Sequence, residues 1–130
     1  MNRQPCHTIW PGPPLAVLAS WLAAPLRSAN QLAMTLQDVG EVQAAADLAQ
    51  DTLNRSRRFL GEDDPETLNS LSNLAADLRA LGQVQAARDL DQDTLHRRRR
   101  VLGVDHPSTL RSADNLAADL RALGEPGDDP

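Results

Sequence analysis

Hydrophobic residues recur along this chain at intervals of three and four positions, in five segments from Leu26 onward. Such spacing gathers them on one side of an α-helix and predicts five amphipathic helices. The first, third and fifth segments, which we call helix A, share one stripe of apolar positions. In the middle copy the stripe is Leu68, Leu71, Leu74, Ala75, Leu78 and Leu81, and in the flanking copies it is Leu26, Ala29, Leu32, Ala33, Leu36 and Val39, then Leu110, Ala113, Leu116, Ala117, Leu120 and Leu123.

Two longer segments, which we call helix B, alternate with these. They run from about Glu41 to Leu60 and from about Gln83 to Leu102. Their apolar sides are Val42, Ala45, Leu48, Leu53 and Leu60, then Val84, Ala87, Leu90, Leu95 and Leu102. A glycine follows every predicted helix, where a residue that tolerates positive φ can end it. The Asp-x-Pro segments 63–65 and 105–107 supply a capping acid and a proline suited to a first helical turn.

The pattern repeats every 42 residues. Thr67–Gly82 matches Thr109–Gly124 at 13 of 16 positions, and Gly40–Pro65 matches Gly82–Pro107 at 18 of 26. A period in this range is typical of stacked-repeat proteins, whose units contact only their neighbours. Such a stack exposes a continuous curved face, so the expected role is to hold another molecule rather than to transform one.

Three features give the repeat a family resemblance. They are Asn-Leu-Ala in helix A, Gly82 and Ala87 five positions apart at the turn, and Leu-Gly-x-Asp-His-Pro at 102–107. The chain resembles tetratricopeptide repeats of the 42-residue kinesin-light-chain type, similar to arrays in bacterial signalling proteins. The resemblance implies an all-α, right-handed stack of antiparallel helix pairs, an α-solenoid of about two and a half repeats.

The resulting organisation has five parts. Residues 26–66 and 67–108 form two repeats, and residues 109–124 form a half repeat. Residues 1–25 do not match the repeat, and we expect one short capping helix there, around Leu15–Ala24. Residues 125–130 are expected to be an acidic tail. The chain is either a module in its own right or a fragment of a larger signalling regulator.

Composition removes several function classes. All 13 basic residues are arginine, so a phosphate-loop lysine and a Schiff-base lysine are both excluded. The net charge of −5 argues against a nucleic-acid-binding protein. One cysteine, Cys6, excludes an intramolecular disulfide and fits a reduced, cytoplasmic setting. The apolar run Leu15–Ala24 is shorter than the ~20 residues of a membrane span, so we expect no membrane association.

The resemblance places a partner-binding groove along the side of helix A next to the apolar stripe. Asparagine amides can donate to and accept from a peptide backbone, and arginine can clamp a carboxylate. We therefore expect a non-catalytic module that binds a protein or peptide of acidic character in this concave groove. The alternative is that these are solvated positions kept by recent duplication of the repeat. The candidate residues are Arg27, Asn30, Gln31, Asn69, Asn73, Arg79, Arg111, Asn115 and Arg121.

Two arginine clusters, 55–58 and 96–100, have a structural and a functional interpretation. At the ends of B helices they oppose the helix dipole, and Asp51 and Asp93 stand four residues before Arg55 and Arg97, the supportive order for ion pairs. The alternative is a nucleic-acid-binding accessory protein that uses these clusters.

No catalytic set is visible in the sequence. The three histidines stand apart from any nucleophile, His106 is expected to be a loop or cap residue, and aspartates that recur with the repeat are expected on the surface. We therefore expect no enzyme activity, no cofactor and no metal.

The fifth helix, about Pro107–Leu123, lacks in this sequence the helix B that covers the equivalent earlier stripe. Leu116, Leu120 and Leu123 cannot all be buried against the preceding helix, so part of this stripe is expected to be exposed. The exposed stripe predicts self-association through this helix or stabilisation by a partner, with Leu15–Ala24 capping the opposite end.

Overall fold

The computed structural model describes residues 15–124, with side chains from residue 25 onward. It contains α1 (Leu15–Asp38), α2 (Val42–Phe59), α3 (Pro65–Ala80), α4 (Val84–Leu102) and α5 (Pro107–Ala122). Within residues 15–124 no segment forms a β-strand. The prediction of an all-α repeat stack is confirmed.

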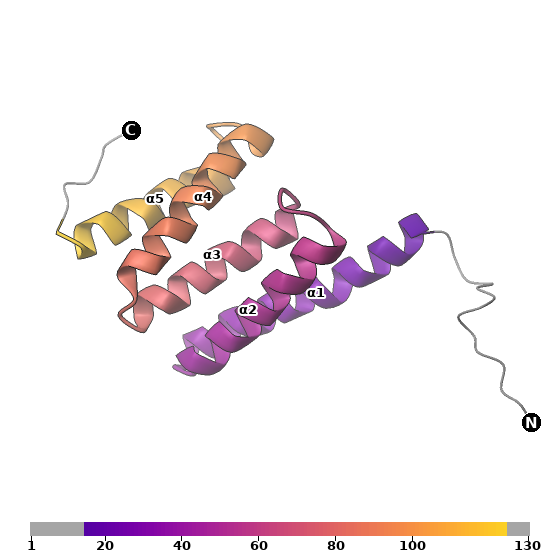
Figure 1. Cartoon of the computed structure of the whole chain (residues 1–130), viewed down its shortest axis with the longest axis horizontal. Coiled ribbons are helices and arrows are strands. Elements are labelled where there is room, and N and C mark those ends of the chain that lie inside the picture. Colours follow the sequence, from indigo (N-terminus) through magenta and orange to yellow (C-terminus); the bar gives the residue numbers. More distant parts are fainter. Residues whose placement is uncertain (1–14, 125–130) are drawn as a thin grey trace, which may run out of the picture.

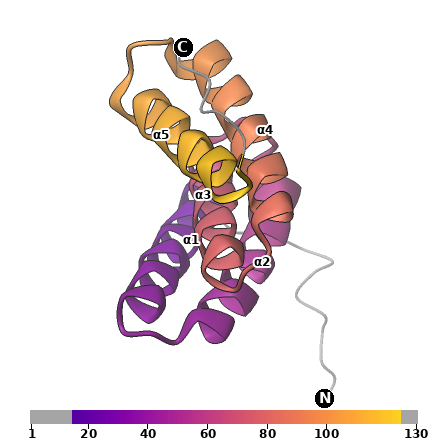
Figure 2. The same cartoon turned by 90° about the vertical axis from the view of Figure 1, so that its left-hand side faces the viewer.

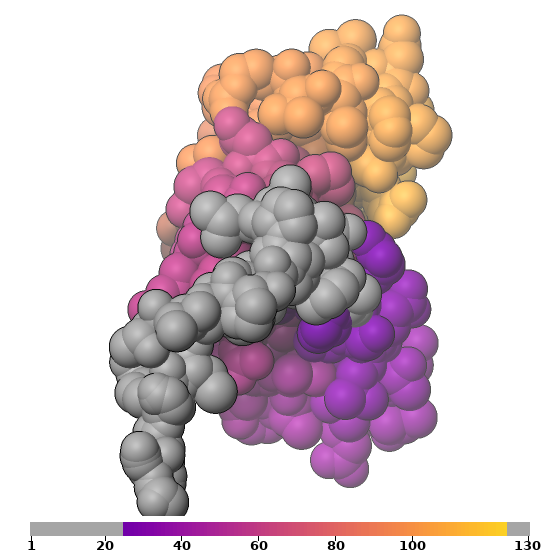
Figure 3. Space-filling model, turned by 90° about the vertical axis from the view of Figure 1, so that its right-hand side faces the viewer, coloured from indigo at the N-terminus to yellow at the C-terminus, as the bar shows by residue number. Residues whose placement is uncertain are grey.

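The helices lie in two layers. Each helix packs against the next one in the chain, and α3 also contacts α1 and α5 (Figure 1). Seen from the side, α1, α3 and α5 form one layer, and α2 and α4 form the other (Figure 2). The space-filling view follows the chain order through the stack, from purple at the bottom to orange and yellow at the top (Figure 3). This arrangement brings the A helices together on one face.

The N-terminal part of the stack differs from the sequence prediction. The short helix expected around Leu15–Ala24 is not separate, because α1 continues from Leu15 through Pro25 to Asp38. A proline removes only one backbone hydrogen bond, and the alanines before it favour helix. The capping role expected of Leu15–Ala24 depends on side chains outside the described part of the chain. The acidic tail, 125–130, lies outside it as well.

The helix ends follow the signals in the sequence. Gly82 has a φ of 88°, and the adjacent N–H groups of Gly82 and Gln83 donate to the carbonyls of Arg79 and Leu78. The cap of α3 is not Asp63, the first residue of the Asp-x-Pro segment, but Asp64, whose side chain accepts from the Glu66 N–H at 2.9 Å. His106 does the same for α5, where its Nδ1 accepts from the Ser108 N–H at 3.0 Å. The cap role predicted for His106 is confirmed.

The apolar core lies among α1, α2 and α3. Its buried members are Ala33, Ala46, Ala49, Leu53, Leu68, Leu71 and Leu74, and Leu48, Leu78 and Leu90 pack against them. The stripes predicted for the first and fifth segments are buried less completely. Leu32, Val39 and Leu110 are exposed, and Leu116, Leu120 and Leu123 are half-buried. The exposure expected on the fifth helix is therefore present.

Candidate functional site

A groove of about 250 Å³ is lined by residues of α1, α3 and α5, together with Arg98 of α4. We call it the inner groove. It brings together seven of the nine candidate residues, which come from three A helices 42 residues apart. These seven are Arg27, Asn30, Gln31, Asn69, Asn73, Arg111 and Asn115. They lie close together because equivalent positions, 42 residues apart, fall on the same side of each A helix.

The deepest part of the inner groove at α1 is a hydrogen-bond network. Asn30 is buried, and its Nδ2 donates to the Glu66 Oε1 at 3.0 Å and to the Glu66 carbonyl at 3.2 Å. Ser70 Oγ donates to Asn30 Oδ1 at 2.8 Å, and Asn73 Nδ2 donates to the Asn30 carbonyl at 3.3 Å. Asn30 therefore joins α1 to α3, and its amide is already engaged without a ligand.

Glu66 lines the inner groove and was not among the candidate residues. Its Oε2 lies 3.3 Å from Arg27 Nε, which partly neutralises that arginine. Its place in the first turn of α3 was readable from the sequence, since acids favour helix N-termini. That it reaches Arg27 and Asn30 depends on how α1 packs on α3, which no local pattern gives.

Arg98 is the second residue that sequence reasoning missed. Its place in the 96–100 cluster suggested a cation that opposes the helix dipole, yet it is buried and lines the inner groove. Its Nη2 donates to Asn69 Oδ1 at 3.0 Å, and its Nη1 donates to Ser112 Oγ at 2.8 Å and to the Ser108 carbonyl at 3.3 Å. Arg98 thus ties α4 to both α3 and α5.

The charge of Arg98 is not balanced by a close carboxylate. Within the described residues, no carboxylate oxygen lies within 4.0 Å of its guanidinium. Burial, followed by the positive charge of Arg111, lowers its pKa from the ordinary arginine value. The α3–α5 half of the inner groove therefore carries a positive field from Arg98 and Arg111, flanked by the amides of Asn73 and Asn115.

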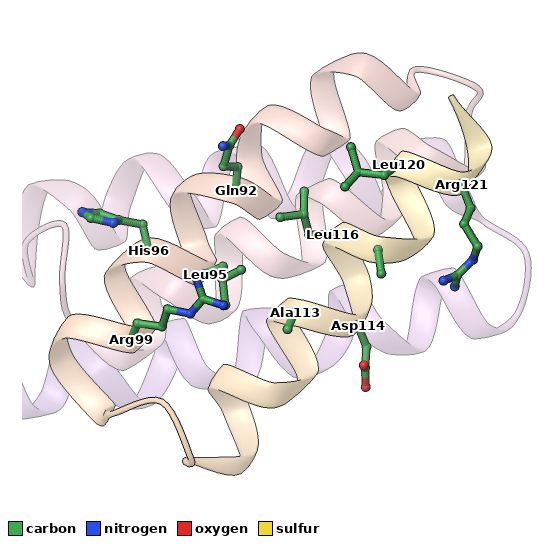
Figure 4. A pocket seen from close by; sticks show the side chains of 10 residues that line it. Gln92, Leu95, His96, Arg99, Ala113, Asp114, Leu116, Leu120 and Arg121 are labelled. Atoms are coloured by element: carbon green, nitrogen blue, oxygen red, sulfur yellow. The ribbon is translucent and has the colours of Figure 1, made fainter. Parts of the chain in front are cut away.

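Two candidate residues do not line the inner groove. Arg79 lies 3.1 Å from Asp119 Oδ1 through its Nε and 3.9 Å from Asp91 Oδ2 through its Nη2. Arg79 therefore links α3 to α4 and α5 through these ion pairs. Arg121 lines a different hollow, between α4 and α5 (Figure 4).

Three buried aspartates correct the expectation that these acids lie on the surface. Asp77, Asp91 and Asp119 are almost fully buried. Burial raises the pKa of Asp77 to about 6. Burial, together with a hydrogen bond to Asp119 and its negative charge, raises the pKa of Asp91 to about 8. Asp91 therefore holds a proton at neutral pH, because burial and the neighbouring Asp119 both disfavour its charged form.

The outer arginine clusters are engaged in ion pairs, as their spacing predicted. Arg55 pairs with Asp51 and Arg97 with Asp93, each at 3.1 Å. Asp63 also binds both Arg97 and Arg100, at 2.9 Å and 2.8 Å, and these arginines lower its pKa. Much of the positive charge at the end of α4 is therefore neutralised within the protein.

The described residues contain no group of three or more His, Cys, Asp or Glu side chains that could hold a metal ion. None of their helices is both long and apolar enough to cross a membrane.

Comparison with known proteins returns one family and a set of solved structures. The model of the tetratricopeptide repeat family matches residues 26–66 and 67–108. A crystal structure from Podosopora anserina, described as a kinesin light chain with nearly identical TPR-like repeats, is 34% identical, with a TM-score of 0.71 over 77% of this chain and 47% of that one. A variant of it with one glutamine changed to methionine gives a TM-score of 0.70 at the same identity and coverage. This chain thus spans about half the length of these structures. A search of curated proteins found no match.

Proposed function

Since the chain belongs to the tetratricopeptide repeat family, whose repeats generally mediate protein–protein interactions, we propose that it is a non-catalytic module that binds an acidic peptide segment of a partner protein in the inner groove. The observation that carries this proposal is Arg98. A buried guanidinium without a close carboxylate, facing a groove beside Arg111, favours an anionic side chain that enters from solvent.

The remaining side chains of the inner groove suit the backbone of such a peptide. Asn73 and Asn115 lie one repeat apart, so their amides can contact successive stretches of an extended chain. Asn115 Nδ2 makes only a long contact of 3.5 Å, with Ser72 Oγ, which leaves its hydrogen-bonding capacity largely free. The acidic segment should occupy the α3–α5 half, because Glu66 repels negative charge at the α1 end.

The other functional alternatives gain less support. A nucleic-acid-binding role for residues 96–100 is disfavoured, because Arg97 and Arg100 pair with Asp63 and the chain has a net charge of −5. A cytoplasmic location fits the single cysteine. A place in bacterial signalling rests only on the resemblance between repeat arrays and stays a prediction.

A binding experiment with charge-matched peptides tests the proposal. Short fluorescent glutamate-rich peptides would be titrated with the protein, next to peptides in which lysine replaces each glutamate. We expect saturable binding of the glutamate-rich set, and Arg111→Ala should weaken it about fivefold, the effect of losing roughly 1 kcal/mol. Arg111 is suited to this test because it is exposed, so its truncation leaves the fold intact.

Arg55→Ala is the matched control. It removes another exposed arginine, from α2, which contributes no residue to the inner groove. The affinity of Arg55→Ala for the glutamate-rich peptides should equal that of the unaltered protein. Equal binding of both peptide sets, or equal loss in Arg55→Ala and Arg111→Ala, would show that the inner groove is not the site.

A further inference from the structure

A second hollow, which we call the end groove, lies between α4 and α5. Its volume is about 590 Å³, and its floor is apolar, with Leu95 on α4 and Leu116 and Leu120 on α5. Figure 4 shows Leu95 and Leu116 extending into the space between the two helices, with Arg121 at the far end of α5. The end groove and the inner groove have no lining residue in common.

The repeat itself shows what fits this shape. The residues 42 positions before Leu95 and Leu116 are Leu53 and Leu74, which belong to the buried core. Those two leucines lie on α2 and α3, and α4 packs against α3 there, with Leu90 against the core cluster. Leu95 is buried like Leu53, so the end groove is open on its α5 side, where Leu116 is half-buried whereas Leu74 is buried. The lining of the end groove therefore resembles the surface on which α4 packs, and it could bind one more helix of that kind.

Charge adds a second requirement on the occupant. Arg79, the residue 42 positions before Arg121, makes its ion pairs with Asp91 of α4 and with Asp119. Arg121 lines the end groove, and within the described residues no carboxylate lies within 4.0 Å of it. His96 and Arg99 add basic side chains to the rim, where Asp114 is the one acid. An occupant should therefore present an acid to Arg121.

We propose that the end groove is a docking site for an amphipathic helix of a partner protein, with a leucine and alanine stripe and an aspartate at the place that Asp91 holds in α4. The stripe would cover Leu116 and Leu120, as α4 packs against α3, where the equivalent Leu74 and Leu78 lie, one repeat earlier. The aspartate would pair with Arg121. This surface is separate from the inner groove, so the chain would engage partners at two places.

A labelled synthetic peptide with the sequence of residues 83–103 is the probe, because it carries the α4 pattern. Its fluorescence anisotropy would be followed as the full chain is added. We expect saturable binding, which Leu116→Asp should abolish while circular dichroism shows retained helicity. If the peptide does not bind to the folded protein, the proposal is overturned.

A charge exchange locates the peptide. Changing Asp91→Arg in the peptide should weaken binding to the unaltered protein about threefold to tenfold, and Arg121→Asp in the protein should restore it. The matched control is Arg58→Asp, an equal change of charge on α2. Failure of Arg121→Asp to restore binding, or an equal effect of Arg58→Asp, would contradict the predicted contact.

A second copy of the chain is the competing occupant. Sedimentation velocity over a wide concentration range would reveal it as a dimer that Leu116→Asp dissociates. A monomer that binds the peptide supports the proposal. A dimer that the peptide cannot dissociate would overturn it in favour of self-association.

Discussion

The two junctions between successive repeats share their backbone architecture but differ in what they bury. In the first, formed by α1, α2 and α3, a cluster of leucine and alanine is buried together with uncharged polar side chains such as Asn30, Thr52 and Ser70. In the second, where α4 and α5 pack on α3, the buried side chains also include Asp91 and Arg98, whereas the buried Asp119 has a buried counterpart one repeat earlier in Asp77. Near-identical repeats can therefore be held together by different forces, because a few positions decide the character of each junction.

Three pairs of positions account for the difference. Ala49, Ser56 and Leu71 of the first junction correspond to Asp91, Arg98 and Ala113 of the second. The change from leucine to alanine removes apolar burial that is typically worth about 2–5 kcal/mol in a packed core. The other two changes introduce charges whose desolvation must be offset by partners. We therefore expect α5 to be held less strongly than α3.

The largest expected effect contrasts two equivalent leucines. Leu74→Asp places a charge in the apolar core and should unfold the chain. Leu116→Asp places the same charge at a half-buried position and should leave most of the helical signal in circular dichroism. Unfolding by both variants would show that the two junctions form one equally cooperative core.

The same contrast separates the features that the sequence predicts from those that it does not. Apolar periodicity and glycine positions predicted the helices, because both are local signals. Local signals do not tell which polar side chains a later helix will cover. Asp119 was therefore expected on the surface, and Arg98 was assigned only a role against the helix dipole, although packing of α5 buries both. Glu66 and Arg98 were missed in the inner groove for the same reason, since each reaches it through contacts between helices.

A smaller effect concerns pH and the acid pair of the second junction. In the unfolded chain Asp91 should have a pKa near the ordinary value of about 4, whereas in the folded protein it is raised to about 8. Between these values the folded protein holds a proton that the unfolded chain has lost. Rising pH therefore lowers the free energy of unfolding, by up to about 1.4 kcal/mol per pH unit from this group.

Asp91→Asn tests this dependence by removing the titrating carboxyl while keeping its size. Urea unfolding at a series of pH values should give a flatter profile for the variant, which should be the more stable protein above pH 8. Asp119 and Arg79 remain beside the new amide, and Arg98 acts on the site through its charge. Asp89→Asn, an exposed position on the same helix, is the control and should keep the original slope. Parallel profiles for all three proteins would contradict the raised pKa of Asp91.

The central claim, that the two junctions differ in strength because of what they bury, is tested most directly by amide hydrogen exchange measured by mass spectrometry. Protection of α3 should exceed that of α5, and after correction for intrinsic rates the gap should widen as pH rises from about 4 to about 8 and then level off, because only in that range does the folded protein hold an Asp91 proton that the unfolded chain has lost. Equal protection of the two helices, unchanged across that range, would contradict the account.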